Sequence, residues 1–430
     1  MRPTTVALLS LLSACASGPD ADVVEESSPA ADSSSSAATD VAEDSTTAAV
    51  DGPTFYEDIA PILAETCVRC HADGGIAPFS LVDYEDAATW AAAIVASTHA
   101  RTMPPINADA SGACNEFVGL RWLTDDELSL VSQWQATGAQ SGDPANAPAA
   151  PGPELGLAEP DRVLDTGVEY TPVGTDDYRC FVVDPELEVD TFMTAYQVLP
   201  GNKSVSHHLI LFGIDSEAGE QLIAQLDADD PGPGYSCFGG PGTDETRFLA
   251  GWAPGLGITR MPAGSGVRMP AGRSVVMQMH YNTAAGVGSD RTTIALELAE
   301  VVDRQGQFVP IASREFSLAP ELALAETSFT GPVPGTGEIE IWGVGPHMHT
   351  RGRTMRVTAA TTDGEACLLD VPSWDFSWQS AYFYREPVVL HGGDMVTLSC
   401  GFDTRGATGN TTWGESTADE MCLNYLYVVQ

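Results

Sequence analysis

The run Lys203-Ser-Val-Ser-His-His-Leu-Ile-Leu-Phe-Gly213 carries a row of large apolar side chains and predicts a β-strand. Runs of the same kind recur along this half of the chain, separated by Gly, Pro and Asp. Together with the first they are Thr191–Leu199, Ser204–Gly213, Ser274–Tyr281, Glu338–Val344 and Met395–Cys400. Many short strands punctuated in this way predict all-β sandwiches or barrels. Because this half is long for one domain, we predict two jelly-roll-like sandwiches, at residues 159–303 and 304–430.

The residues before the β half predict a small all-α domain at 53–142. Its helical patterns are Phe55 to Glu65, Tyr84 to Ser97 and Thr124 to Thr137. The last begins with a capping box, in which Thr124 and Glu127 can each bond the backbone N–H of the other. Residues 143–158 are rich in Pro, Ala and Gly, so we expect a linker there.

The N-terminus has the features of an export signal. Residues 1–15 contain Arg2 and an apolar stretch far too short to span a bilayer. They end in Leu12-Ser-Ala-Cys15, which resembles a bacterial lipoprotein cleavage box, so we expect a lipid on the Cys15 thiol. The alternative is an ordinary cleaved signal. Residues 16–52 lack large apolar side chains and predict a disordered acidic stalk. We therefore expect an exported lipoprotein, on a periplasmic membrane face, the outer membrane or the cell surface.

The charge of the 430-residue chain limits its partners. It has 19 Lys and Arg against 60 Asp and Glu, a net charge of −41 at pH 7. Such a surface repels nucleic acid and anionic lipid headgroups. We therefore expect no nucleic-acid partner, and no membrane contact apart from the lipid on Cys15.

The segment Cys67-Val-Arg-Cys70-His71 fits the C-x-x-C-H attachment pattern of c-type haem. Two thiols would bond the porphyrin edge, and His71 would ligate the iron. The competing interpretations are a disulfide, or half of a zinc site completed by His99 and Cys114. We predict one covalent haem c in a cytochrome c-like domain.

The sixth ligand of that haem should come from later in the same domain. Met103, in Arg101-Thr-Met-Pro-Pro105, is the predicted ligand, because the loop is held by prolines and thioether ligation raises the haem potential. His99 is the alternative ligand, and ordinary core packing is the alternative role for Met103.

Five of the eight histidines form a pattern in the β half. His347 and His349 have a spacing of two, so on a strand they share a face and can bind one metal ion. His207 and His208 are adjacent and would point to opposite faces of a regular strand. Both can bind one ion only where the strand twists or ends. His280 lies in a later run. Imidazole suits copper, zinc, iron and nickel alike, so the spacing of the histidines does not identify the metal.

These segments together resemble the copper type II, ascorbate-dependent monooxygenases, which include peptidylglycine α-hydroxylating and dopamine β-monooxygenases. The run Lys203–Gly213 is similar to the double-histidine strand of the family, and Gln278–Tyr281 to its third histidine strand. Gly345-Pro-His-Met-His-Thr-Arg-Gly352 is similar to its H-x-H strand, and Asp419–Tyr425 to its terminal methionine strand. The resemblance covers residues 159–430.

The resemblance implies two copper ions. The first, which stores and delivers an electron, would be held by His207, His208 and His280. The second, which binds oxygen and performs the hydroxylation, would be held by His347, His349 and Met421. Tyr425 and Gln278 match positions near the metals, and Tyr425 would belong to the catalytic group.

The resemblance also implies a tertiary arrangement. Two sandwiches would face each other across a solvent cleft, with disulfides Cys180–Cys237 and Cys400–Cys422. Cys114 and Cys367 are left without assigned partners and can pair with each other. His391 matches no ligand and should be structural or on the surface.

The resemblance does not extend to the substrate. Gly345 stands where the peptide-hydroxylating branch has an arginine that holds a carboxylate, and Leu423-Asn424 is transposed. Both departures argue against a peptide C-terminus as the substrate.

We expect a monooxygenase that hydroxylates a C–H bond of a small substrate with O2. Its electrons would come from a reductant or redox protein, through the fused haem. One alternative is a non-catalytic exported electron-transfer or copper-binding lipoprotein. Another is a carbohydrate- or protein-binding sandwich that uses an aromatic face. The alternation of those aromatic residues instead predicts strand core; they are Trp374, Phe376, Trp378, Tyr382, Phe383 and Tyr384.

Overall fold

The computed structural model describes residues 52–72, 77–147, 156–254, 256–284, 286–414 and 419–430. The predicted signal peptide, the lipid on Cys15 and nearly all of the predicted stalk lie outside these residues, as does much of the predicted linker. Among the described helices, none combines the length and apolar character needed to cross a membrane.

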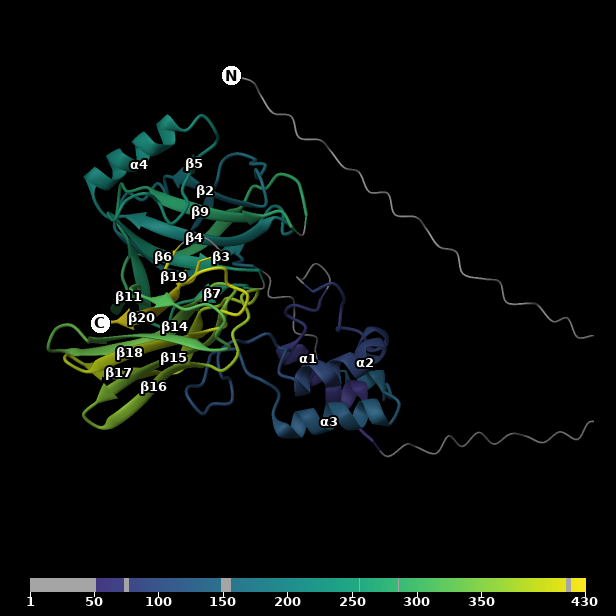
Figure 1. Cartoon of the computed structure of the whole chain (residues 1–430). Coiled ribbons are helices and arrows are strands. Elements are labelled where there is room, and N and C mark those ends of the chain that lie inside the picture. Colours follow the sequence, from purple (N-terminus) through teal and green to yellow (C-terminus); the bar gives the residue numbers. More distant parts are fainter. Residues whose placement is uncertain (1–51, 73–76, 148–155, 255, 285, 415–418) are drawn as a thin grey trace, which may run out of the picture. The chain divides into compact units, whose positions relative to one another are not determined.

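The predicted helices are present. A π turn, η1 (Phe55–Ile59), leads into α1 (Ala60–Thr66), and α2 (Tyr84–His99) and α3 (Asp125–Ala136) follow (Figure 1). The predicted capping box is confirmed, since Glu127 N–H donates to Thr124 Oγ1 at 3.3 Å and Thr124 N–H donates to Glu127 Oε2 at 2.8 Å. The helices bury a shared apolar core, which includes Phe55, Ile59, Leu63, Val131 and Trp134.

The β half begins, after the short helix η2 (Pro144–Asn146), with ten strands and one helix. They are β1 (Arg162–Asp165), β2 (Asp176–Val183), β3 (Thr191–Leu199), β4 (Ser206–Ile214), α4 (Glu217–Asp229), β5 (Tyr235–Ser236), β6 (Thr246–Trp252), β7 (Thr259–Arg260), β8 (Ser265–Met269), β9 (Val275–Asn282) and β10 (Thr293–Ala299). A five-stranded sheet in the order β5-β2-β9-β4-β6 carries the predicted double-histidine strand next to the third histidine strand.

Ten more strands complete the chain. They are β11 (Arg304–Ser313), β12 (Ser317–Leu318), β13 (Ala325–Pro332), β14 (Glu338–His347), β15 (Gly352–Thr361), β16 (Gly364–Val371), β17 (Tyr382–His391), β18 (Met395–Phe402), β19 (Thr411–Thr412) and β20 (Cys422–Val429). A four-stranded sheet, β13-β18-β15-β16, lies in this part (Figure 1), and β12 pairs with β19.

One sheet runs through both predicted sandwiches. Its order is β1-β10-β3-β8-β11-β20-β14-β17, with β7 added beside β3. The connection between the two halves is the parallel pairing of β8 with β11, from Arg304↔Ser265 to Gly306↔Val267. The predicted sandwiches are therefore joined by backbone hydrogen bonds. Such a short pairing between distant segments leaves no periodic pattern in the sequence.

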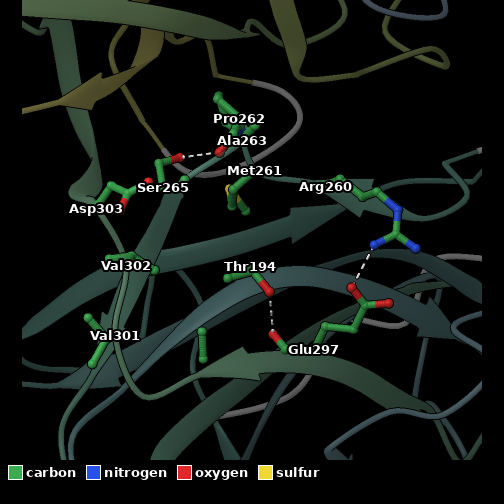
Figure 2. A pocket seen from close by; sticks show the side chains of 12 residues that line it. Thr194, Arg260, Met261, Pro262, Ala263, Ser265, Glu297, Val301, Val302 and Asp303 are labelled. Carbon is green, nitrogen blue, oxygen red and sulfur yellow. Dashed lines mark hydrogen bonds and ion pairs between the residues drawn. The ribbon is translucent and has the colours of Figure 1, made fainter.

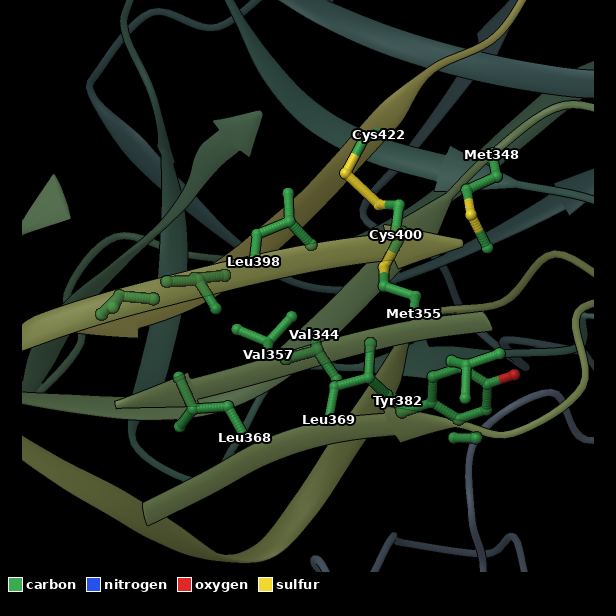
Figure 3. Packing of buried hydrophobic residues seen from close by; sticks show 14 of the residues in the cluster. Val344, Met348, Met355, Val357, Leu368, Leu369, Tyr382, Leu398, Cys400 and Cys422 are labelled. Atoms are coloured by element: carbon green, nitrogen blue, oxygen red, sulfur yellow. A yellow bond between two sulfur atoms is a disulfide. The ribbon is translucent and has the colours of Figure 1, made fainter. Parts of the chain in front are cut away.

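Two large apolar cores lie against this shared sheet. The core of the C-terminal half packs between the four-stranded sheet and strands β14, β17 and β20; Figure 3 shows Met355, Val357 and Leu398 facing Val344 and Tyr382. Burying a side chain such as Leu398 contributes about 1.5–3 kcal/mol. This packing gives the metal-ligand candidates a rigid support.

Three disulfides are present. Cys180–Cys237 and Cys400–Cys422 confirm the pairs that the resemblance implied. The third joins Cys114 to Cys367, the two cysteines that had no assigned partner. It fixes the segment between α2 and α3 to strand β16.

That segment, residues 106–118, is here called the strap. Ile106 and Phe117 belong to the apolar core of the C-terminal half. Asp109 N–H donates to Asp370 O at 2.7 Å, and Val118 N–H donates to Phe383 O at 2.8 Å. The strap therefore packs on β16 and β17, although in sequence it lies between the helices α2 and α3.

Candidate metal centres

His207, His208 and His280 come together on neighbouring strands β4 and β9. The sequence left open how two adjacent histidines could face one ion. The answer is a shift in the β4–β9 register between Ser206 and His208, which pairs His208 with His280 and leaves His207 as the extra residue. A β-bulge of this kind re-aims a side chain. It brings both adjacent histidines to the same side.

The spacing of these three rings fits a metal ion. The Nδ1 atom of His208 lies 3.4 Å from Nδ1 of His207 and 3.3 Å from Nδ1 of His280. Nitrogen ligands about 2.0–2.1 Å from a tetrahedral ion lie about 3.3–3.4 Å from one another. The Nδ1 atom of His208 therefore has the separation from both neighbours that one bound ion requires, and the ligand atoms of all three rings lie within 4.8 Å of one another.

The surroundings of His280 favour the metal-binding tautomer. Its Nε2–H donates to Asp176 Oδ1 at 3.0 Å, so Nδ1 keeps a lone pair that points into the cluster. The Tyr178 ring stacks on the imidazole with centroids 4.1 Å apart. Burial, together with the neighbouring His207, lowers the pKa of His280 to about 4, and burial lowers the pKa of His208 well below its ordinary value. Both rings are therefore held in the neutral form that binds metals.

His347 and His349 form the second cluster, at the end of β14. Met348 between them is fully buried in the core (Figure 3), so the two histidines lie on the opposite face, with ring centroids 5.1 Å apart. His347 Nδ1–H donates to Gln379 Oε1 at 2.6 Å, and His349 Nδ1–H donates to Asp419 O at 3.1 Å. These bonds fix the Nδ1–H tautomer of both rings, so Nε2 is the nitrogen with which either ring would bind a metal.

The segment before β20 holds Met421 beside this pair. The buried Glu420 carboxylate accepts the backbone N–H groups of His349, at 2.9 Å, and of Arg351. Burial raises the pKa of Glu420 to about 7. Met421 is 5% exposed, and the next residue is anchored by the Cys400–Cys422 disulfide. A soft thioether together with two imidazoles would be a ligand set that suits Cu(I).

Phe376 lies between the two clusters. Its ring centroid is 5.6 Å from that of His207, with the rings near parallel, and 6.2 Å from that of His349. The prediction that Phe376 is strand core was wrong, because the residue lies in the loop between β16 and β17. Trp374 in that loop and Tyr382 at the start of β17 are buried in the core, so the alternation that suggested one strand spans a loop and the first residues of β17.

The other predicted residues of the β half have these positions. The Tyr425 ring stacks on Phe248 at 4.5 Å, and Gln278 Nε2–H donates to Cys237 O at 2.9 Å. His391 is 62% exposed and forms ion pairs with acidic neighbours.

The C-x-x-C-H residues follow α1. Cys67 and Cys70 are half-buried and are not joined by a disulfide, which excludes that alternative in this structure. His71 Nδ1–H donates to Phe79 O at 3.2 Å, so Nε2 is left available for a ligand. Two unpaired thiols and an imidazole with Nε2 available fit a covalently attached haem.

The two candidates for the sixth ligand differ in environment. Met103 is half-buried in the loop after α2. His99 is exposed and its Nε2 lies 2.8 Å from Ser132 Oγ.

A surface pocket of about 370 Å³ lies elsewhere, along β7, β8 and β10 (Figure 2). Arg260 and Glu297 form an ion pair of 2.6 Å in its wall. None of the residues that line it is a candidate ligand. We therefore assign the pocket no part in the metal centres.

Comparison with known proteins connects this geometry to one family. Residues 296–429 match the family described as copper type II ascorbate-dependent monooxygenase, C-terminal domain. Similar proteins include peptidyl-glycine alpha-amidating monooxygenase A of Xenopus laevis, which is 24% identical over 64% of this chain and 29% of that protein. Dopamine beta-hydroxylase of Rattus norvegicus is 23% identical over 51% of this chain and 40% of that protein.

Tyramine beta-hydroxylase of Caenorhabditis briggsae is 25% identical over 58% of this chain and 45% of that protein. The chain thus spans less than half the length of these curated relatives. Among solved structures, the major capsid protein P2 from Bacteriophage PM2 matches with a TM-score of 0.27 and 7% identity, over 62% of this chain and 96% of that one. That TM-score is too low to support an inference. The chain is therefore related to the copper type II ascorbate-dependent monooxygenases, which are oxygen-incorporating oxidoreductases, and its residues 296–429 match the C-terminal domain of that family.

Proposed function

We propose that this protein is a copper-dependent monooxygenase that hydroxylates a C–H bond of a small substrate with O2. The observation that carries the proposal is the convergence of His207, His208 and His280, where the Nδ1 atom of His208 lies 3.4 and 3.3 Å from those of the other two rings. A second pair, His347 and His349, lies near them, with both Nδ1 atoms held by hydrogen bonds. Two clusters with different ligand sets agree with one copper that transfers electrons and a second copper that binds oxygen.

The first copper would be held by His207, His208 and His280, and the second by His347, His349 and Met421. Copper, when bound, supplies one-electron redox chemistry and a place for O2 to react. The chain itself orients the ligands: Asp176 fixes the tautomer of His280, Gln379 fixes that of His347, and the Asp419 carbonyl fixes that of His349. Phe376 fills space between the clusters with an apolar ring.

The substrate class differs from a peptide C-terminus. Gly345 offers no cationic side chain to hold a carboxylate, and a Cβ added there would lie 3.6 Å from Tyr425 Cβ, an ordinary contact. A Cβ atom therefore fits sterically at this position, beside the predicted catalytic Tyr425. The bare glycine supports a substrate without the carboxylate anchor of a peptide.

Oxygen incorporation tests this proposal. Copper-loaded protein would receive a reductant, isotopically labelled O2 and, in turn, dopamine, tyramine and a peptidyl-glycine, which the names of the relatives suggest. We expect labelled hydroxylated product from an amine, and none from the His349→Ala variant. Equal O2 uptake by both proteins, with no labelled product, would instead favour a copper-binding or electron-transfer protein without catalysis.

We also propose that Cys67, Cys70 and His71 hold one haem c, with Met103 as sixth ligand, and that this haem passes electrons to the copper sites. The unpaired thiols and the available Nε2 of His71 support this. The loop with Met103 continues directly into the strap, which packs on the C-terminal half. Stopped-flow reduction tests the transfer: we expect the haem to be reduced first and reoxidised as Cu(II) is reduced. Reduced haem beside unreduced copper would contradict it.

For the N-terminus we propose export and a lipid on Cys15, followed by an acidic stalk at residues 16–52. The apolar stretch before Leu12-Ser-Ala-Cys15 supports this. We expect the wild-type protein in a bacterial membrane fraction and the Cys15→Ala variant outside that fraction. An unchanged distribution would contradict the lipid anchor.

A further inference from the structure

The loop Trp374–Gln379 contacts both histidine clusters. The Phe376 ring meets His207 and His349, as described above. Gln379 Oε1 accepts the hydrogen bond from His347 Nδ1, and Gln379 Nε2–H donates to Phe376 O at 3.2 Å, so the two side chains are tied to each other. Trp374 Nε1–H donates to His349 O at 3.2 Å. The position of this loop therefore affects the side-chain orientation of three candidate ligands, His207, His347 and His349.

The side-chain amide of Asn107 holds the middle of the loop, at Asp375 and Trp378. Asn107 is 3% exposed, and its amide is fully used by the loop backbone. Its Nδ2 donates to Asp375 O and to Trp378 O, each at 3.0 Å, while its Oδ1 accepts from Asp375 N–H at 2.8 Å. Buried amide groups must find partners, so the loop adopts the turn that this one side chain completes.

Asn107 reaches the loop from the strap. It lies four residues after Met103, and its own N–H donates to the buried Tyr382 hydroxyl at 3.1 Å. The strap has other anchors that do not involve Asn107. The Cys114–Cys367 disulfide is one, and Asn115 is another, because Asn115 Nδ2 donates to Cys367 O at 2.8 Å and Leu368 O at 3.1 Å.

We propose that Asn107 is a positioning residue for the second metal site, acting through the loop Trp374–Gln379. A segment between α2 and α3 thereby completes a site whose ligands all lie in the sandwich. The inference rests on the proposed function in one respect, that the His347 cluster binds copper. Without Asn107, Asp375 N–H and Trp378 O lose this partner, while Asp375 O keeps only the bond from Trp378 N–H at 3.1 Å. The loop is then held less firmly, and Gln379 no longer holds His347 Nδ1 at one fixed position.

The experiment compares Asn107→Ala with Asn115→Ala. Both variants remove a side-chain amide of the strap that bonds backbone carbonyls, but Asn115 bonds β16 and not the loop. The first readout is amide hydrogen exchange in metal-free protein. We expect at least tenfold faster exchange in the peptide covering residues 374–379 for Asn107→Ala, and wild-type exchange there for Asn115→Ala.

The second readout is Cu(II) binding in a His208→Ala background, which isolates the second site. Removing a group that orients a ligand costs about 10–100-fold in metal affinity, so we expect about a tenfold loss for Asn107→Ala. We also expect an altered Cu(II) electron paramagnetic resonance spectrum, which a loss of general stability would not produce. If Asn107→Ala does not fold, Asn107→Asp replaces it, because that side chain keeps the size and the acceptor but loses the two donors.

Two results would overturn the inference. One is unchanged exchange, affinity and spectrum in a folded Asn107 variant. The other is the same changes in Asn115→Ala, since these would come from a loosened strap in general. The exchange experiment contains no metal. It therefore tests whether Asn107 positions the loop, independently of whether the site binds copper. A His208→Ala protein that binds no copper would contradict the proposed function instead.

Discussion

His208 and His280 lie with their Nδ1 atoms 3.3 Å apart on neighbouring strands. Two neutral imidazoles that face each other through the same ring atom can share at most one proton. His207 adds a third Nδ1 atom, 3.4 Å from that of His208. Burial lowers the pKa of His208, so this ring is neutral at neutral pH. Additional protons therefore do not relieve the repulsion among the nitrogen lone pairs. One cation would satisfy all three lone pairs, and this supports the proposed metal site.

Asp176→Ala should weaken copper binding at the first site by about 10–100-fold, because Asp176 Oδ1 holds the Nε2–H of His280. Isothermal titration with Cu(II) in a His349→Ala background measures this site alone. The control is Asp165→Ala, which removes an exposed carboxylate that pairs with Arg291. Equal affinity in the two variants would contradict the role of Asp176.

Met421→Leu should lower the affinity of the second site for Cu(I), since it removes a soft sulfur ligand and keeps the side-chain volume. X-ray absorption of the Cu(I) protein should lose its sulfur scattering. Met348→Leu is the matched control, because Met348 lies between the two histidines but points into the core. Retained sulfur scattering in Met421→Leu would show that Met421 is not a ligand.

Much of this organisation is predictable from the sequence. The strands with large apolar runs, such as Thr191–Leu199, were found because their pattern is local. The bulge at His207 cannot be predicted from the sequence, because it depends on the register with β9. The contact of Asn107 with Asp375 cannot be predicted either, because it joins residues 268 positions apart. Phe376 was misassigned because aromatic alternation looks alike in a strand and in a loop between two strands.

Met103→Ala should lower the reduction potential of the haem, because thioether ligation raises it. His99→Ala should leave the potential unchanged, since His99 is exposed and bonded to Ser132. Spectroelectrochemical titration of haem-loaded protein measures both. A potential that drops only in His99→Ala would reverse the assignment of the sixth ligand.

Replacing Cys114 and Cys367 together by Ser should reduce the free energy of unfolding by about 2–5 kcal/mol, because the disulfide closes a long loop. Urea unfolding under oxidising conditions gives the difference. If the double variant unfolds at the wild-type midpoint with an unchanged slope, the strap is held by its other contacts alone.

Asp230→Asn should destabilise the protein at neutral pH, because Asp230 pairs with the largely buried Arg179 at 2.7 Å. Hydrogen bonds from Arg179 lower the pKa of Asp230 from 3.8 to about 2. A carboxyl group with a lowered pKa stabilises the fold above its ordinary pKa and loses that effect as the pH falls. The difference in melting temperature between variant and wild type should therefore shrink between pH 3.8 and 2. A difference that grows with acidity would contradict the pairing.

Metal content per chain tests the central claim most directly. Protein matured with haem in a periplasm and loaded with copper would be analysed for copper and iron, with His349→Ala and His208→Ala alongside. We predict two coppers and one haem iron in the wild type, with one copper and the same iron in each variant. One iron and no copper after loading would contradict the assignment of both histidine clusters as copper sites.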